Sequence, residues 1–244
     1  MSEHESEQVE QQPETPTSIK DSMGKNGIIL AVFALVTTAL ISITYFGTVE
    51  QIAAQKQKKL LDTLNAVIDK GSYDNQIQFD CVIVSSAPLL GDKLPKHIYR
   101  ATLKGEPTAV AIETTAPDGY SGKIELLVGV KTASVPGEAL VTGVRVIKHK
   151  ETPGLGDKID LRINDWVLSF NDKIYSDALL SNWAVKKDGG QFDQFTGATI
   201  SPRAVVNAVK KSVEYYLANQ VDISSEVNGC SITQQSSQKV SNDE

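Results

Sequence analysis

An uncharged, mostly apolar stretch near the N-terminus constrains this chain more than any other feature. From Gly27 to Val49 there is no Asp, Glu, Lys or Arg, and Ile, Leu, Val, Phe and Ala dominate. About 20 consecutive apolar residues are what an α-helix needs to cross the hydrocarbon core of a bilayer. The stretch therefore predicts one transmembrane helix over residues 27–49.

A cleaved signal peptide is the competing interpretation of the same stretch. Signal peptides have a short basic N-terminal region, a shorter apolar core and a cleavage site between small residues. Here residues 1–26 are polar and rich in glutamate, and the apolar stretch has full spanning length. We therefore expect an uncleaved anchor, preceded by a disordered cytoplasmic tail over residues 1–26. Lysines flank the stretch on both sides, so the charge bias does not decide its orientation.

The segment after the apolar stretch predicts a helical stalk over residues 50–78. Apolar residues recur at helical spacing from Ile52 to Ile68, and Gly71 is a typical C-terminal stop. We expect this stripe to pack on the chain's own domain, although docking on a partner helix would leave the same pattern.

Short β-type runs separated by turn signals follow the stalk. The predicted strands are Cys81–Ser85, His97–Leu103, Thr108–Thr114, Lys123–Val130 and Leu140–His149. Connections as short as these favour an antiparallel meander. Helical spacing returns over Leu161–Phe170 and again after Pro202. The predicted fold is therefore α+β: a mainly antiparallel sheet flanked by helices over residues 79–221, then a polar C-terminal tail over residues 222–244.

Charge and composition exclude several classes of function. A net charge of −6 argues against nucleic acid as a partner, which requires a basic face. Two cysteines and three histidines are too few for a cysteine-rich or multi-histidine metal site, so no metal is expected. Cys81 and Cys230 form one long-range disulfide if the domain faces an oxidising compartment, or else are two unrelated buried thiols. The sequence leaves both interpretations open.

The segment Thr196-Gly197-Ala198-Thr199 stands directly before the predicted C-terminal helix. We expect Ser201 to be the N-cap of that helix and Pro202 its first residue. The amides and dipole at a helix N-terminus attract an anion, so the Thr199 hydroxyl is placed to carry a phosphate group or to lie beside one. On local chemistry alone, an ordinary helix cap is the better explanation of the segment.

This segment resembles the [Ser/Thr]-Gly-Ala-Thr signature of the FMN-binding domain family, in which FMN is held by a phosphoester bond to the last threonine. The resemblance implies covalent FMN on Thr199. It also implies that the neighbouring residues bind the cofactor, namely Thr196, Gly197, Ala198 and Ser201.

Two further loops extend the resemblance. The loop from Glu151 to Gly156 is similar to a Glu-Thr-Pro-Gly-Leu-Gly loop that lies along the flavin in that family. It implies these flavin contacts: Glu151, Thr152, Gly154, Leu155 and Gly156. Tyr120 belongs to an element similar to the Gly-Tyr-x-Gly element that lies near the cofactor in the family. Its ring either stacks on the flavin or packs in the core.

From the apolar stretch to about residue 217, the chain resembles the G-subunit family of Rnf-type (Rsx-type) electron transport complexes. That family implies an electron-relay subunit of a membrane complex that couples ferredoxin and NAD oxidation–reduction to ion movement. The relay carries no complete catalytic activity of its own and has no catalytic residue. Its extracytoplasmic FMN-binding domain is implied to lie on the periplasmic side of the bacterial inner membrane. Its partners would be the other complex subunits and a separate flavin transferase that uses FAD and a divalent cation.

Three alternatives remain open. The first is the corresponding subunit of a sodium-pumping NADH:quinone oxidoreductase, which shares the threonine linkage. The second is a membrane-anchored flavin sensor, and the third is an assembly subunit whose Thr196–Thr199 segment is only a cap. The sequence lacks Gly-x-Gly-x-x-Gly, P-loop and Gly-x-Ser-x-Gly motifs, which argues against an NAD-binding Rossmann unit, an ATPase or a serine hydrolase.

Overall fold

The computed structural model describes residues 19–85 and 87–230, and the chain divides into two compact units, residues 1–55 and 56–244. The first unit is built on helix α1 (Ile19–Asn65), which is long and apolar enough to cross a membrane. Its large apolar side chains, such as Phe33, are exposed, as lipid-facing residues would be. Because α1 begins at Ile19, residues 19–26 are helical rather than disordered. The rest of the predicted N-terminal tail lies outside the described residues.

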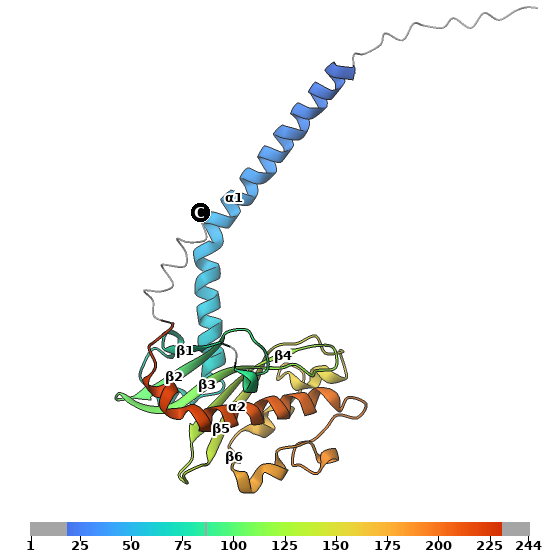
Figure 1. Cartoon of the computed structure of the whole chain (residues 1–244). Coiled ribbons are helices and arrows are strands. Elements are labelled where there is room, and N and C mark those ends of the chain that lie inside the picture. The colour runs from blue at the N-terminus through green and yellow to red at the C-terminus, as the bar shows by residue number, and fades with distance from the viewer. Residues whose placement is uncertain (1–18, 86, 231–244) are drawn as a thin grey trace, which may run out of the picture. The chain divides into compact units, whose positions relative to one another are not determined.

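The second unit contains one sheet of six strands whose spatial order follows the chain order (Figure 1). The strands are β1 (Cys81–Val84), β2 (Lys96–Leu103), β3 (Glu106–Ala116), β4 (Ile124–Thr132), β5 (Ala139–Lys148) and β6 (Lys173–Tyr175). Every neighbouring pair is antiparallel, which confirms the predicted meander. The turn between β2 and β3 shows how the meander closes: Lys104 and Gly105 both have positive φ, as the tightest hairpin turns require.

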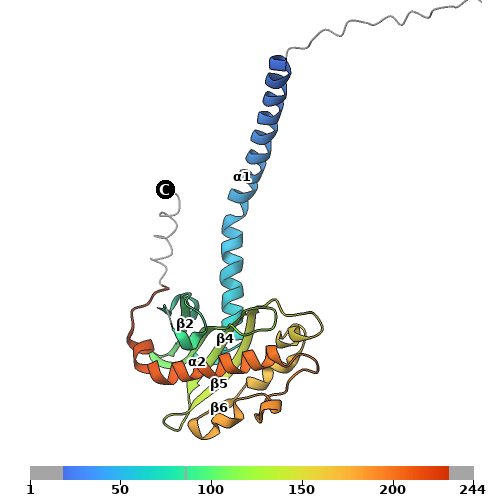
Figure 2. The same ribbon diagram turned by 45° about the vertical axis from the view of Figure 1, so that its right-hand side comes forward.

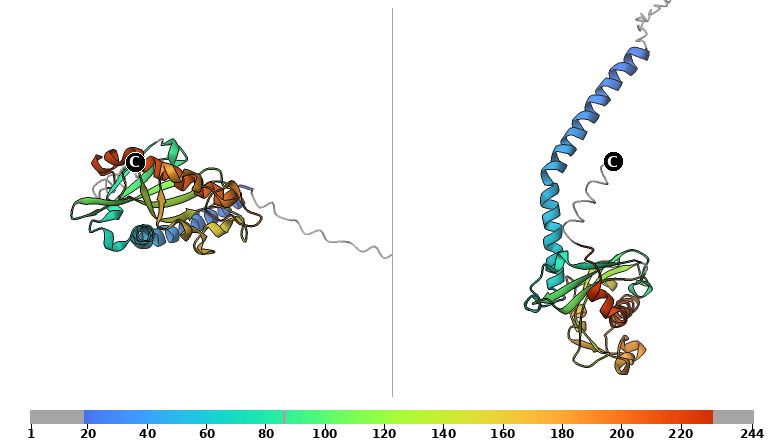
Figure 3. Two further views of the ribbon diagram at one scale, coloured as in Figure 1. Left: turned by 90° about the horizontal axis from the view of Figure 1, so that it is seen from below. Right: turned by 60° about the vertical axis from the view of Figure 1, so that its left-hand side comes forward.

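Helices cover the two faces of this sheet (Figure 3, left). Helix α2 (Ile200–Ser225) buries Val205, Val209 and Val213, which recur at helical spacing, against one face. The C-terminal turns of α1 belong to the same unit and bury Leu64 on the opposite face, beside Leu127. Burial of these faces removes apolar surface from water and supplies most of the driving force for the fold. The α+β prediction is therefore confirmed.

The chain leaving α1 touches the sheet at a pair of glycines. Gly129 on β4 and Gly143 on β5 are register partners. A Cβ on Gly129 would lie 2.2 Å from the carbonyl oxygen of Val67, so a side chain there would push this segment off the sheet. Thr142 donates its hydroxyl to the same Val67 carbonyl. The predicted stalk helix consequently ends at Asn65, and the residues after it pack on the sheet.

The segment between β5 and α2, yellow to orange in Figure 2, differs most from the prediction. Leu161–Phe170 was expected to be a helix, but only Asp165–Phe170 is helical, as a 3₁₀ turn capped by Asn164. Trp166 and Phe170 instead belong to a buried aromatic cluster, in which the Phe170 ring stacks on Phe192 at 4.4 Å. Strand β6, which is only three residues long, was not predicted.

Residues beyond the predicted domain end also pack on the domain. Helix α2 continues to Ser225, and the side chain of Asn228 accepts a hydrogen bond from the amide of Cys81 at 3.2 Å. The amide of Gly229 donates to the Cys81 carbonyl at 2.8 Å, and Cys81 is joined to Cys230 by a disulfide. Residues 222–230 thus belong to the domain because they cover the edge of β1. The remainder of the predicted polar tail lies outside the described residues.

Replacing both Cys81 and Cys230 by serine should lower the free energy of unfolding by about 2–4 kcal/mol, because the bridge closes a very long loop. Thermal unfolding of the full chain in detergent measures this. The wild type should show the same loss on addition of a reductant, and the double variant should not respond to it. Labelling of both thiols in non-reduced, denatured wild type would contradict the pairing.

A histidine–carboxylate pair on β2 and β3 predicts a pH dependence of stability. The Nδ1 of His97 lies 2.8 Å from Glu113. That hydrogen bond raises the pKa of His97 above its ordinary 6.5, despite partial burial. Burial alone would raise the pKa of Glu113, but the bond from His97 holds it below its ordinary 4.5. Stability from the histidine is full below pH 6.5 and lost as pH rises through its raised pKa. Stability from Glu113 is present above pH 4.5 and lost as pH falls through its lowered pKa.

His97→Gln should therefore cost about 0.2–1 kcal/mol near pH 5.5 and little near pH 8.5, since the pair is partly exposed to solvent. Urea unfolding of the wild type and the variant at both pH values measures the difference. An equal cost at the two pH values would show that the pair adds no charge-dependent stability.

Candidate functional site

The Thr196–Thr199 segment forms a tight turn that is fastened to the aromatic cluster. The amide of Ala198 donates to the carbonyl of Phe195 at 3.0 Å, and Gly197, within the turn, has a φ of +80°. Phe195 is buried with its ring 5.3 Å from that of Trp166. Trp166 in turn donates its indole N–H to the carbonyl of Asp193 at 2.8 Å. These contacts anchor the chain on which Thr199 stands.

Thr199 occupies the N-cap position of α2, but its hydroxyl makes no capping hydrogen bond. The prediction that Ser201 caps this helix is wrong, because α2 already begins at Ile200. Ser201 is buried within the first turn and donates its hydroxyl to Glu151 instead. Pro202 is tolerated there, since the first amides of a helix have no intrahelical acceptor. The Thr199 side chain is therefore left available beside the helix N-terminus.

Glu151 joins three segments of the site. Its carboxylate accepts the hydroxyl of Ser201 on α2 and, at 3.0 Å, the amide of Ser121 in the loop that carries Tyr120. The side chain is 4% exposed, so these hydrogen bonds are what stabilise its carboxylate in the interior. The Glu151 amide donates to Nδ1 of His149 at 3.2 Å, which gives that histidine a structural role. Glu151 thus holds the walls of the site together.

These segments surround a cavity of about 570 Å³. The residues that line it are Tyr120, Glu151, Thr152, Leu155, Gly156, Lys187, Gly197, Ala198, Thr199, Ile200 and Ser201. Most of the residues expected at the cofactor are therefore brought together, although they come from three separate parts of the chain. Thr196 and Gly154 belong to the same loops but do not line the cavity.

Two lining residues, Lys187 and Ile200, were missed by the sequence reasoning. Ile200 follows Thr199 directly and could have been found from its position. Lys187 lies in a turn (Lys186–Asp188) that has the composition of an ordinary solvated loop, so no sequence signal singled it out.

Three residues that line the cavity have large apolar side chains that are exposed to solvent. Tyr120 is 69% exposed, which argues against core packing for its ring. Leu155 and Ile200 are each 45% exposed at the same cavity. Large apolar side chains that line an open cavity are typical of a ligand site, because the ligand covers them.

The chemistry of the cavity fits FMN. Its volume falls within the range of about 300–1,000 Å³ that small-molecule sites occupy. Tyr120, Leu155 and Ile200 offer apolar surface for a flat ring system, and Thr152 and Thr199 offer hydroxyl groups for polar parts of the ligand. The helix N-terminus and Lys187 offer positive charge for a phosphate.

Comparisons with known proteins agree with this geometry. Residues 119–214 match the family model of the FMN-binding domain, and residues 18–67 match that of the RnfG N-terminal region. A relative from Pseudoalteromonas atlantica, the G subunit of an ion-translocating oxidoreductase complex, is 60% identical over 87% of this chain and 96% of its own length. The relative of the same name from Vibrio cholerae is 53% identical over 84% of this chain and 96% of its own length.

A crystal structure of NqrC from Shewanella oneidensis also matches, with a TM-score of 0.38 and 20% identity over 64% of this chain and 74% of that one. The sequence relatives, in contrast, are matched over almost their whole length and at high identity. They show that this chain, with its apolar N-terminal helix and FMN-binding domain, belongs to the G-subunit family of ion-translocating oxidoreductase complexes.

Proposed function

We propose that this chain carries FMN on Thr199 through a phosphoester bond and relays electrons within an ion-translocating oxidoreductase complex of the Rnf type. One observation carries the proposal: Thr199 stands at the N-terminus of α2 on the wall of the cavity, and its hydroxyl caps nothing. In an ordinary N-cap, that hydroxyl would accept a hydrogen bond from a helix amide. Bound FMN supplies the electron transfer, and the protein supplies its placement and its electrostatic surroundings.

Attachment to Thr199 transfers FMN from FAD and releases AMP. The bond between its Oγ1 and the phosphorus of the FMN half of FAD forms as the pyrophosphate bond breaks. AMP leaves, and the threonine hydroxyl proton is released. The chain presents its hydroxyl beside unpaired helix amides that stabilise phosphate charge. It offers no nucleotide-binding motif for FAD, so a separate flavin transferase with a divalent cation performs the transfer.

The cofactor's other contacts follow from the cavity. Tyr120 and Leu155, which line the cavity, would cover the ring system, and Thr152 would hydrogen-bond its polar edge. Glu151 and Ser201 are bonded to each other, so they act mainly by holding the loops in place. Thr196 and Gly154 shape the loops without lining the cavity.

The membrane anchor places the relay among the other subunits of the complex, in the bacterial inner membrane. We infer that the domain lies on the periplasmic side, because disulfides such as Cys81–Cys230 persist in oxidising compartments. Covalent linkage suits that side, where a dissociated cofactor would be lost. Protease added to spheroplasts should digest the domain. A domain that is digested only after lysis would lie on the cytoplasmic side instead.

Intact mass of the full chain, co-expressed with a flavin transferase, tests the central proposal. The mass should increase by one FMN less one water. An unmodified mass, with the transferase shown to be active on another substrate, would exclude the relay. Co-purification from native membranes should recover Rnf-type subunits rather than those of a quinone reductase.

A further inference from the structure

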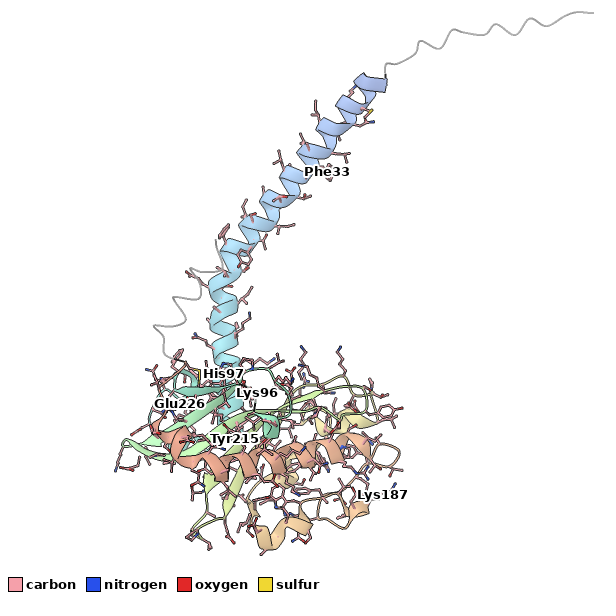
Figure 4. All side chains as sticks on the ribbon, in the orientation of Figure 1. Phe33, Lys96, His97, Lys187, Tyr215 and Glu226 are labelled. Carbon is pink, nitrogen blue, oxygen red and sulfur yellow. A yellow bond between two sulfur atoms is a disulfide. The ribbon has the colours of Figure 1, made fainter. Side chains whose placement is uncertain are left out.

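The turn that carries Lys187 is held against the first turn of α2. Asp188 accepts two hydrogen bonds from Arg203, at 2.6 and 2.8 Å. Arg203 belongs to the α2 turn, and its amide bonds the carbonyl of Thr199 at 3.2 Å. The ion pair therefore ties the Lys186–Asp188 turn to the position of Thr199. Figure 4 shows Lys187 on the loop at the N-terminal end of α2, with Glu226 at the other end of the helix.

Backbone contacts fix this turn further. The Lys186 amide donates to the carbonyl of buried Phe192 at 2.7 Å, and the Lys187 amide donates to the side chain of Gln194 at 3.1 Å. These bonds hold the backbone of Lys187 in place. A flexible stem with a point charge is well suited to follow a phosphate on a neighbouring residue.

The cationic neighbours of Lys187 already have ion-pair partners. Lys186 is bound to Asp193 at 2.6 Å, and Arg203 is bound to Asp188. The hydrogen bond from Arg203 is the main cause that lowers the pKa of Asp188, and the charge of Lys187 contributes less, so that carboxylate is stabilised mainly by Arg203. Within the part of the chain that the structure describes, no ion pair within 4.0 Å joins Lys187 to an acidic side chain. Among the cavity-lining residues described, Lys187 alone has a cationic side chain.

We propose that Lys187 is the cation that pairs with the phosphodiester on Thr199. This rests on the proposed covalent attachment and adds the residue that neutralises its charge. The phosphodiester has one negative charge, and the helix N-terminus contributes only a partial positive charge. The Lys187 ammonium, which lines the same cavity, supplies the remainder. Lys187 also favours the approach of the phosphate during attachment, since opposite charges steer one another.

Two readouts on the full chain in detergent test this: the rate of FMN incorporation by intact mass, and the phosphorus NMR resonance of the mature phosphodiester. Lys187→Gln should incorporate FMN about two- to fivefold more slowly, the range expected of one partly screened ion pair. Its phosphorus resonance should shift from the wild-type position. Lys187→Arg keeps the charge and should restore most of the rate.

Lys186→Gln is the matched control, since it removes the same charge from the adjacent residue, whose partner is Asp193. It should leave both readouts at wild-type values. A phosphorus resonance in Lys187→Gln that coincides with that of Lys186→Gln overturns the pairing, even if incorporation is slower. In that case Lys187 would contact the transferase. An unmodified wild type would instead reject the proposed function, so the two failures are distinguishable.

Discussion

Thr199→Ala should abolish covalent flavin completely, giving a chain that runs as a dark band under ultraviolet light after denaturation. The reason is chemical: alanine has no oxygen with which to form the phosphoester. The fold should survive, because the Thr199 hydroxyl makes no capping hydrogen bond with α2. Loss of a hydroxyl that caps nothing should change the free energy of unfolding by less than about 0.5 kcal/mol.

Thr196→Ala is the matched control. It removes a hydroxyl of the same kind three positions earlier, from a residue that does not line the cavity. Its band should remain fluorescent and its mass should include FMN. A fluorescent Thr199→Ala band would show that FMN is attached to a different residue. Loss of fluorescence in both variants would show that the turn itself, and not one hydroxyl, is required.

The second large effect is expected at Gly197. Its φ of +80° lies in a region that β-branched residues rarely adopt, so valine there strains or reshapes the turn. The nearest atom to an added Cβ, beyond the chain neighbours, is a Leu155 methyl carbon at 3.9 Å, so the cause is backbone conformation and not crowding. Gly197→Val should therefore displace Thr199 and reduce FMN incorporation at least about tenfold, as when a reacting group is misplaced by about 1 Å.

Gly137→Val is the control for strain alone. Gly137 has a φ of +82°, has nothing within 4 Å of an added Cβ, and lies in the turn between β4 and β5. Both variants should lose about 1–3 kcal/mol of stability. Only Gly197→Val should lose the flavin, as measured by intact mass. Equal incorporation in the two variants would mean that the transferase does not require this turn geometry.

Most of the fold could be predicted because its signals are local. An uncharged apolar stretch specifies a helix that can span a membrane, and β-branched runs with short turns specify an antiparallel meander. The region between β5 and α2 could not be predicted in the same way. Its apolar residues from Leu161 to Phe170 have helical spacing, but Trp166 and Phe170 are buried in an aromatic cluster with Phe192, whereas Leu161 and Ile163 are exposed. Tertiary packing there outweighs local propensity.

The sequence by itself determined the long apolar helix and the antiparallel sheet, because these depend on residues close together in the chain. Only the tertiary structure decided which side chains meet at the cavity. It assigned the Ser201 hydroxyl to Glu151 instead of to the helix, and it placed Lys187 among the residues that line the cavity together with Thr199. Both outcomes depend on contacts between segments that are distant in the chain. Hydrogen bonds and ion pairs between such segments form only once the hydrophobic faces of the sheet are covered.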